Sequence, residues 1–187
     1  MTRQLEILIL ILLSSLPFGS FGQSNSNYET EEIKVINQFL FKIIGGERLS
    51  DFNKTDKPLL LYFQTKLECN LDIDASFKGE YKSNKLLRNI ENNKLGTRII
   101  DSTEIETIER IKIKFENSRN YTTEEKDSEQ VIGTLSISRI SFNKSLKIGY
   151  FYYSIYCGED CGWGALVKIE KKNGVWEIID YLTSWTS

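Results

Sequence analysis

The segment CGEDCGWG, residues 157–164, gathers side chains that could do chemistry. Its two thiols could form a redox pair. The thiols and acids together could form a mixed metal site. Glu159 and Asp160 could act as an acid–base pair or bind a cation. Redox pairs normally have C-x-x-C spacing at the start of a helix, which lowers the thiol pKa. Here the spacing is one residue longer, and β-rich sequence flanks it. Soft and hard ligands on one tight loop suit no metal well, so we predict no metal and no cofactor.

A β-turn closed by a disulfide accounts for more of this segment. Its three glycines allow positive φ or close backbone approach, and Asp160 suits a turn. A bridge between Cys157 and Cys161 would close a loop of about five residues and contribute about 2 kcal/mol in the chain-entropy model. We therefore predict this disulfide and a free thiol at Cys69, with a bridge from Cys69 to one of the pair as the alternative.

The aromatic run YFYYSIY, residues 150–156, precedes that turn and alternates like a strand. Phe151, Tyr153 and Ile155 share one face and are predicted to be core. The tyrosines of the other face form either a second layer under a helix or one wall of a ligand groove. Trp163 has no evident role in a turn, whereas Trp176 and Trp185 fit core or sheet-edge positions. The candidate binding residues are Glu159, Asp160, Trp163, Tyr150 and Tyr152.

The chain contains no histidine, which excludes serine–histidine and cysteine–histidine catalysis and histidine zinc sites. Phosphate-binding glycine loops, nucleophile elbows and EF-hand loops are also absent from the sequence. We predict no catalytic residue. The alternative is a carboxylate-dependent hydrolase or a small-molecule enzyme of the NTF2-like type, with Glu159, Asp160 or Asp180 as its acids.

Length and charge bound the class of protein. A chain of 187 residues with 40% hydrophobic content predicts one domain. The net charge of -2 at pH 7 gives no field that would attract a polyanion. We therefore expect no nucleic-acid partner. The expected oligomeric state is a monomer.

The first 22 residues have the pattern of an export signal. Arg3 supplies a basic start, residues 7–16 an apolar segment, and residues 20–22 a cleavage site before Gln23. Pro17 and two serines shorten the apolar run below the roughly 20 residues that a membrane helix needs. We expect cleavage, no stable membrane insertion, and a mature periplasmic or secreted chain that spans residues 23–187.

Periodicity predicts the elements that position these residues. Residues 28–44 favour an amphipathic helix, residues 59–63 a buried strand, 86–90 a short helix, 97–100 a short strand, 102–108 a helical turn and 111–116 a half-buried strand. Residues 117–130 are almost entirely polar and predict a solvated loop.

From residue 134 to the end, four β-rich runs with short connections predict an antiparallel meander. The apolar parity of the first run switches near Ser138 and Arg139, which predicts a bulge. The expected fold class is α+β, with an N-terminal helix packed on a curved antiparallel sheet.

The C-terminal part, from Ile137 to Ser187, resembles a group of small secreted or lipid-anchored proteins of Bacteroidota. The matching segments are ISR at 137–139, FNK at 142–144, CGEDCGWG at 157–164, NGVW at 173–176 and WTS at 185–187. No activity is established for that group, so the resemblance implies an origin and a fold module. The ending NGVWEI is also similar to the last strand of NTF2-like domains, an analogy of fold only. Together these features predict an exported, non-enzymatic binding module that recognises an unknown ligand or protein.

Overall fold

The computed structural model describes residues 21–44, 57–67, 83–116, 130–158 and 160–186. The chain divides into two units, Met1–Glu31 and Glu32–Ser187. The first unit contributes the start of helix α2 (Phe21–Ile43), where the Thr30 hydroxyl donates to the Ser26 carbonyl oxygen. This helix begins seven residues before the predicted start at Tyr28. Most of the predicted signal, and Cys69, lie outside the described residues.

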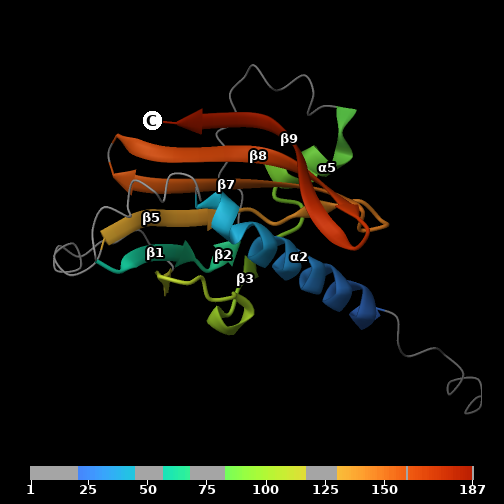
Figure 1. Cartoon of the computed structure of the whole chain (residues 1–187). Coiled ribbons are helices and arrows are strands. Elements are labelled where there is room, and N and C mark those ends of the chain that lie inside the picture. The colour runs from blue at the N-terminus through green and yellow to red at the C-terminus, as the bar shows by residue number, and fades with distance from the viewer. Residues whose placement is uncertain (1–20, 45–56, 68–82, 117–129, 159, 187) are drawn as a thin grey trace, which may run out of the picture. The chain divides into compact units, whose positions relative to one another are not determined.

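The second unit is built on a seven-stranded sheet whose main path is β4-β1-β5-β7-β8-β9, with β6 paired to β7 (Figure 1). The strands are β1 (Leu59–Gln64), β4 (Ile111–Glu116), β5 (Gln130–Ile137), β6 (Ser141–Phe142), β7 (Ile148–Gly158), β8 (Cys161–Lys172) and β9 (Val175–Thr186). A separate two-stranded sheet joins β2 (Lys66–Leu67) to β3 (Arg98–Ile99). The short helices are α5 (Lys85–Glu91) and the 3₁₀ turn η2 (Ser102–Glu104).

The predicted meander is confirmed, since β5, β7, β8 and β9 pair antiparallel in that order. The pairing of β1 was not predicted, because β1 runs parallel to both of its neighbours, β4 and β5. Parallel neighbours need a long crossover, and α5, β3 and η2 lie in the segment that connects β1 to β4. The expected α+β class is therefore confirmed, with a sheet that is mostly, and not wholly, antiparallel.

The predicted bulge lies between β5 and β6. Ile137 pairs with Tyr153 and Ser141 with Tyr150, so residues 138–140 oppose only residues 151 and 152. The Ser138 hydroxyl replaces a backbone acceptor at this point, because Tyr152 N donates to its Oγ at 2.9 Å. The bulge thus keeps the backbone hydrogen-bonded while it reverses the parity of the strand.

The bulge also creates a binding position for Glu32 of α2, whose side chain is fully buried. Its carboxylate accepts from Ile140 N at 2.8 Å, from Arg139 Nε at 2.9 Å and from an Arg98 guanidinium nitrogen at 3.2 Å. Arg98 also forms an ion pair with Glu104, so this network joins two arginines to two glutamates. Buried carboxylates are stable only when paired in this way, and this network attaches α2 to the sheet.

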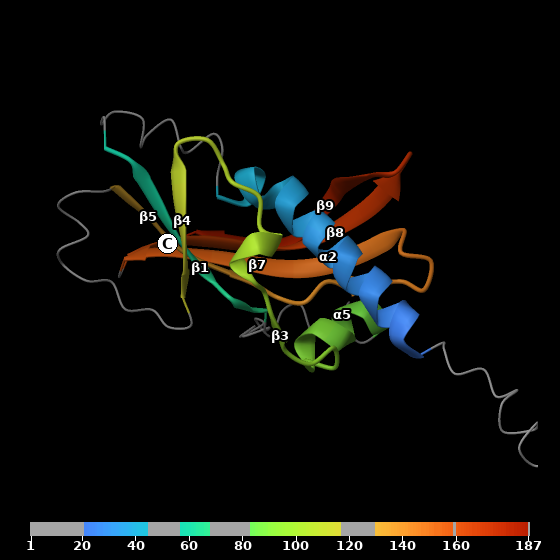
Figure 2. The same cartoon turned by 90° about the horizontal axis from the view of Figure 1, so that it is seen from below.

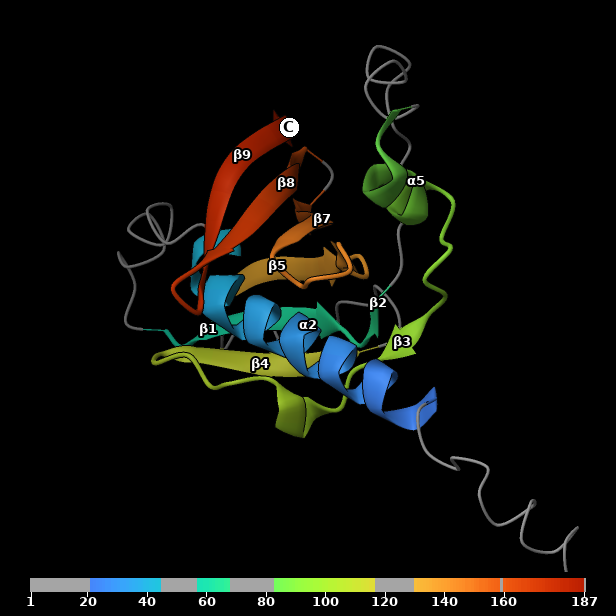
Figure 3. The ribbon, with the colours of Figure 1, turned by 90° about the vertical axis from the view of Figure 1, so that its right-hand side faces the viewer.

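From Glu32 onward, α2 packs on one face of the sheet (Figures 2 and 3). The rings of Phe39 and Phe151 stack with their centroids 6.4 Å apart. Gln38 exchanges two hydrogen bonds with the backbone of Trp176 at the start of β9. The side-chain amide of Asn37 also makes two hydrogen bonds: it donates to Glu104 O and accepts from Glu106 N. Helix α2 is thereby fixed between η2 and the edge strand β9.

Helix α5 packs on the opposite face of the sheet. Its N-cap is Asn84, whose side chain accepts from Leu86 N at 3.0 Å. Its buried residues, Leu87 and Ile90, cluster with Tyr150 of β7 and Leu166 of β8. The tyrosine face of β7 is therefore covered by a helix at this end.

Candidate functional site

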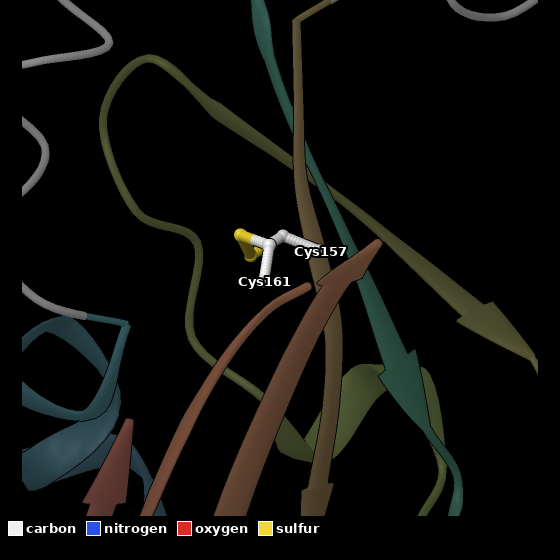
Figure 4. Close-up of a disulfide and its surroundings, with 2 residues drawn as sticks. All are labelled: Cys157 and Cys161. Atoms are coloured by element: carbon white, nitrogen blue, oxygen red, sulfur yellow. A yellow bond between two sulfur atoms is a disulfide. The ribbon is translucent and has the colours of Figure 1, made fainter. Parts of the chain in front are cut away.

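The predicted disulfide between Cys157 and Cys161 is present at the end of the β7–β8 hairpin, with a Cα–Cα distance of 5.0 Å (Figure 4). Tyr156 pairs with Gly162, and Gly158 pairs with Cys161, so Cys157 is the extra residue of a bulge. The sequence prediction placed the whole of residues 157–164 in a loop, and that part is wrong. Both strands continue into the segment, β7 as far as Gly158 and β8 from Cys161.

The four described candidate binding residues do not share one face of the sheet. Asp160 is exposed at the hairpin tip, and Glu159 lies outside the described residues. Trp163 pairs with Ile155 and is only 9% exposed on the face that α2 covers. Its indole Nε1 donates to the Ile43 carbonyl oxygen at 3.1 Å and so satisfies one of the free carbonyls at the end of α2.

Tyr150 and Tyr152 lie on the other face of the sheet. Tyr150 is buried under α5, whereas Tyr152 is half-buried at the margin of that cluster. Tyr150 thus belongs to a layer under a helix, and Tyr152 begins the part of this face that α5 does not cover. The alternative, one wall of a ligand groove, stays a prediction.

We call the part of this face that α5 does not cover the Trp185 strip, and the strand register defines it. It consists of Tyr152, Ser154 and Tyr156 on β7, Gly162 and Gly164 on β8, and Trp185 on β9. Ser154 pairs with Gly164, which in turn pairs with Trp185. Trp185 Nε1 donates to the Tyr152 hydroxyl at 2.9 Å, and the Tyr156 ring lies 5.4 Å from the Trp185 ring.

Two glycines make room for the Trp185 ring. A methyl group at Gly164 would lie 2.6 Å from Trp185 Nε1, and one at Gly162 would lie 3.1 Å from the far edge of the same ring. Since these glycines are two residues apart on one face of β8, the indole extends flat along that strand. One indole face therefore contacts the backbone of β8, and the other points away from the sheet.

Ser154 occupies the centre of the strip and is 4% exposed. Among the residues that the structure describes, its hydroxyl has no hydrogen-bond partner. Ser136 of β5 pairs with Ser154, and its hydroxyl donates to Gln64 Oε1. A buried hydroxyl without a partner destabilises a fold by about 1–3 kcal/mol, so its presence in this strip requires a reason.

Two described groups have shifted pKa values, and neither belongs to the strip. The backbone N–H and the hydroxyl of Thr103 lower the pKa of Asp101, which caps η2. The carboxylate of Glu177 raises the pKa of Lys172 through a hydrogen bond and its charge. Both groups lie at the surface, where such shifts accompany ordinary caps and ion pairs.

Within the described part of the chain, no group of three or more acidic or cysteine side chains is placed to hold a metal ion. No helix among the described residues is long and apolar enough to cross a membrane. The candidate acids Asp160 and Asp180 are both exposed.

Comparison with known proteins returned no match: no protein-family model, no curated protein and no solved structure is similar to this chain. The Trp185 strip therefore has to be interpreted from its own residues.

Sequence reasoning missed Trp185, Ser154 and the two glycines as parts of one surface. Two signals for them are present in the sequence. Gly162 and Gly164 alternate with Trp163 and Ala165, which in a strand produces a face without side chains that an aromatic ring on the next strand can cover. Ser154 is the one non-aromatic, non-aliphatic residue in the run YFYYSIY, and it falls between two tyrosines of the same face.

Proposed function

We propose that this protein is an exported, non-enzymatic binding module and that the Trp185 strip is its ligand-binding surface. The observation that carries the proposal is the combination of a flat, half-buried indole with a buried hydroxyl that has no partner among the described residues. Binding sites typically join apolar and aromatic surface to a few placed polar groups, and the strip has both.

Export is supported by two features. Cysteines 157 and 161 form a disulfide, and disulfides persist in oxidising compartments. The first 22 residues have the composition of a cleavable signal. The proposal includes an origin among the secreted proteins of Bacteroidota and a fold related to NTF2-like domains, as the two resemblances imply.

The test is a binding screen with two tryptophan-face variants. Wild-type protein, expressed from the full-length sequence with its disulfide formed, is titrated with neutral oligosaccharides, octapeptide mixtures and small aromatic compounds. Binding is followed by thermal shift. Trp185→Ala removes the indole of the strip. Tyr181→Ala is the matched control, since Tyr181 is a 45% exposed aromatic on the same strand but on the other face.

We expect at least one probe to stabilise wild-type protein and Tyr181→Ala, and to lose that effect in Trp185→Ala. If every probe that stabilises the wild type also stabilises Trp185→Ala equally, the strip is not the binding surface and the proposal fails.

A further inference from the structure

We propose that the ligand of the Trp185 strip is a neutral saccharide. This inference rests on the proposed function, because it names the ligand class of the same surface. Three properties of the strip lead to it: the shape of the indole platform, the chemistry of Ser154, and the charge of the surrounding sheet.

The platform is suited to a flat ring with C–H groups on one face. The indole of Trp185 is held flat by Gly162 and Gly164, and its nitrogen is fixed by the Tyr152 hydroxyl. A rigid aromatic face that needs no reordering on binding loses little conformational entropy. Tyr156, tilted by 42° to the indole, borders one side of that platform.

Ser154 adds a requirement for a hydrogen-bonding ligand. A purely apolar ligand would cover the strip and leave the Ser154 hydroxyl without a hydrogen bond. The free energy lost in this way would weaken the binding of such a ligand. Because only 4% of Ser154 is exposed, the group that reaches it must be small. A sugar provides such a group, since its hydroxyls project from the rim of a ring whose face is apolar.

The charge of the strip disfavours ionic ligands. Tyr156 pairs across the sheet with residues of β5, β1 and β4 in turn. In this row of paired residues the charged side chain is Lys114, on the edge strand β4. Three strand spacings separate β4 from β7, about 14 Å. Lys114 also lies 5.9 Å from the Tyr62 ring centroid, and Asp160 at the tip would repel an anion. Phosphate and carboxylate ligands need nearby cationic donors, which this row does not supply. On the same face Lys168 lies beyond the strip, between Tyr150 of β7 and Asp180 of β9, whose opposite charge offsets it.

A quaternary ammonium group, which aromatic cages bind, is also disfavoured. Such a cage needs open space between its rings. Here Trp185 is hydrogen-bonded to Tyr152 and its ring centroid is 5.4 Å from that of Tyr156, so the three side chains already contact one another.

The experiment uses the full-length protein with its disulfide intact and a panel of neutral hexasaccharides: β-1,4-glucan, α-1,4-glucan, β-1,4-mannan and β-1,4-xylan. Octapeptide mixtures, inorganic phosphate and choline are the competing probes. Isothermal titration calorimetry measures binding to the wild type and to every variant. Tryptophan fluorescence is added only for proteins that retain Trp185, on which it reports because Trp163 and Trp176 are 9% and 2% exposed. The variants are Trp185→Ala, Ser154→Ala and, as the control, Tyr181→Ala.

We expect one or more hexasaccharides to give a saturable fluorescence change in wild type and in Tyr181→Ala. Ser154→Ala should weaken the binding by about three- to tenfold, the effect of one neutral hydrogen bond, and Trp185→Ala should abolish it. The fold of Ser154→Ala can be checked by its unfolding midpoint, which should not decrease.

Two other outcomes overturn the inference in different ways. If only a peptide, phosphate or choline binds, and that binding depends on Trp185, the ligand class is wrong while the proposed function stands. If a hexasaccharide binds equally to wild type and Trp185→Ala, or if no probe binds at all, both the ligand class and the proposed function are overturned.

Discussion

Replacing Ser154 by alanine should stabilise the protein, although the residue is buried in the middle of a strand. The substitution removes a hydroxyl that is 96% buried and has no partner among the described residues, and the methyl group that remains fits the same space. Because an unpaired buried hydroxyl destabilises by about 1–3 kcal/mol, we expect the free energy of unfolding to rise by about 1 kcal/mol. With a urea m-value of about 2 kcal/mol/M, the midpoint should rise by about 0.5 M.

The same substitution at Ser138 is the matched control, and the structure predicts the opposite sign. Ser138 is equally buried, yet its hydroxyl accepts from Tyr152 N and donates to Arg139 O, both at 2.9 Å. Ser138→Ala leaves a buried backbone N–H unpaired and should lower the free energy of unfolding by about 1–3 kcal/mol. Urea unfolding followed by circular dichroism measures both variants. An equal loss of stability in the two would refute the assignment of Ser154 as unpartnered.

Three further predictions concern the elements around the strip. Replacing Cys157 and Cys161 by serine should lower the free energy of unfolding by about 2 kcal/mol, because the bridge closes a loop of about five residues; denaturant unfolding measures it, and alkylation of all three cysteines in unreduced protein would contradict the disulfide. Gly164→Ala should displace the Trp185 ring, which shifts the tryptophan emission to the red and destabilises the fold by about 1–3 kcal/mol; an unchanged spectrum would show that the ring does not lie on β8. Arg139→Ala leaves a buried carboxylate short of a cation and should reduce stability by about 3–5 kcal/mol in urea unfolding; a loss below about 1 kcal/mol, as exposed pairs give, would contradict the buried network.

Much of the fold could be predicted from local pattern. The alternation of Ala165, Val167 and Ile169 defines β8, and the apolar stripe of residues 33–44 defines the part of α2 that covers the sheet. The parity switch near Ser138 identified the bulge, because a strand with one extra residue must change the face on which its side chains lie. In each case the signal resides in neighbouring residues.

The features that could not be predicted depend on contacts between distant segments. In the predicted helix 28–44 Glu32 is an ordinary acid near the start, and only the fold brings it to Arg139 and Arg98. The parallel pairing of β1 with β4 and β5 has no local signature, because it is decided by a crossover that spans more than forty residues. The slot for Trp185 likewise combines glycines of β8 with a ring of β9, and a search within one strand cannot find it.

If the outer face of Trp185 binds a ligand, titration of the three indole N–H resonances should detect it at that residue. Assignment by tryptophan substitution distinguishes Trp185, which is hydrogen-bonded to Tyr152, from Trp163, which is bonded to Ile43, and from Trp176. On addition of the neutral hexasaccharide panel, we predict that the Trp185 resonance shifts with saturation while the other two stay in place. A panel that leaves the Trp185 resonance unmoved, or that moves the buried Trp163 resonance in its stead, would contradict the account.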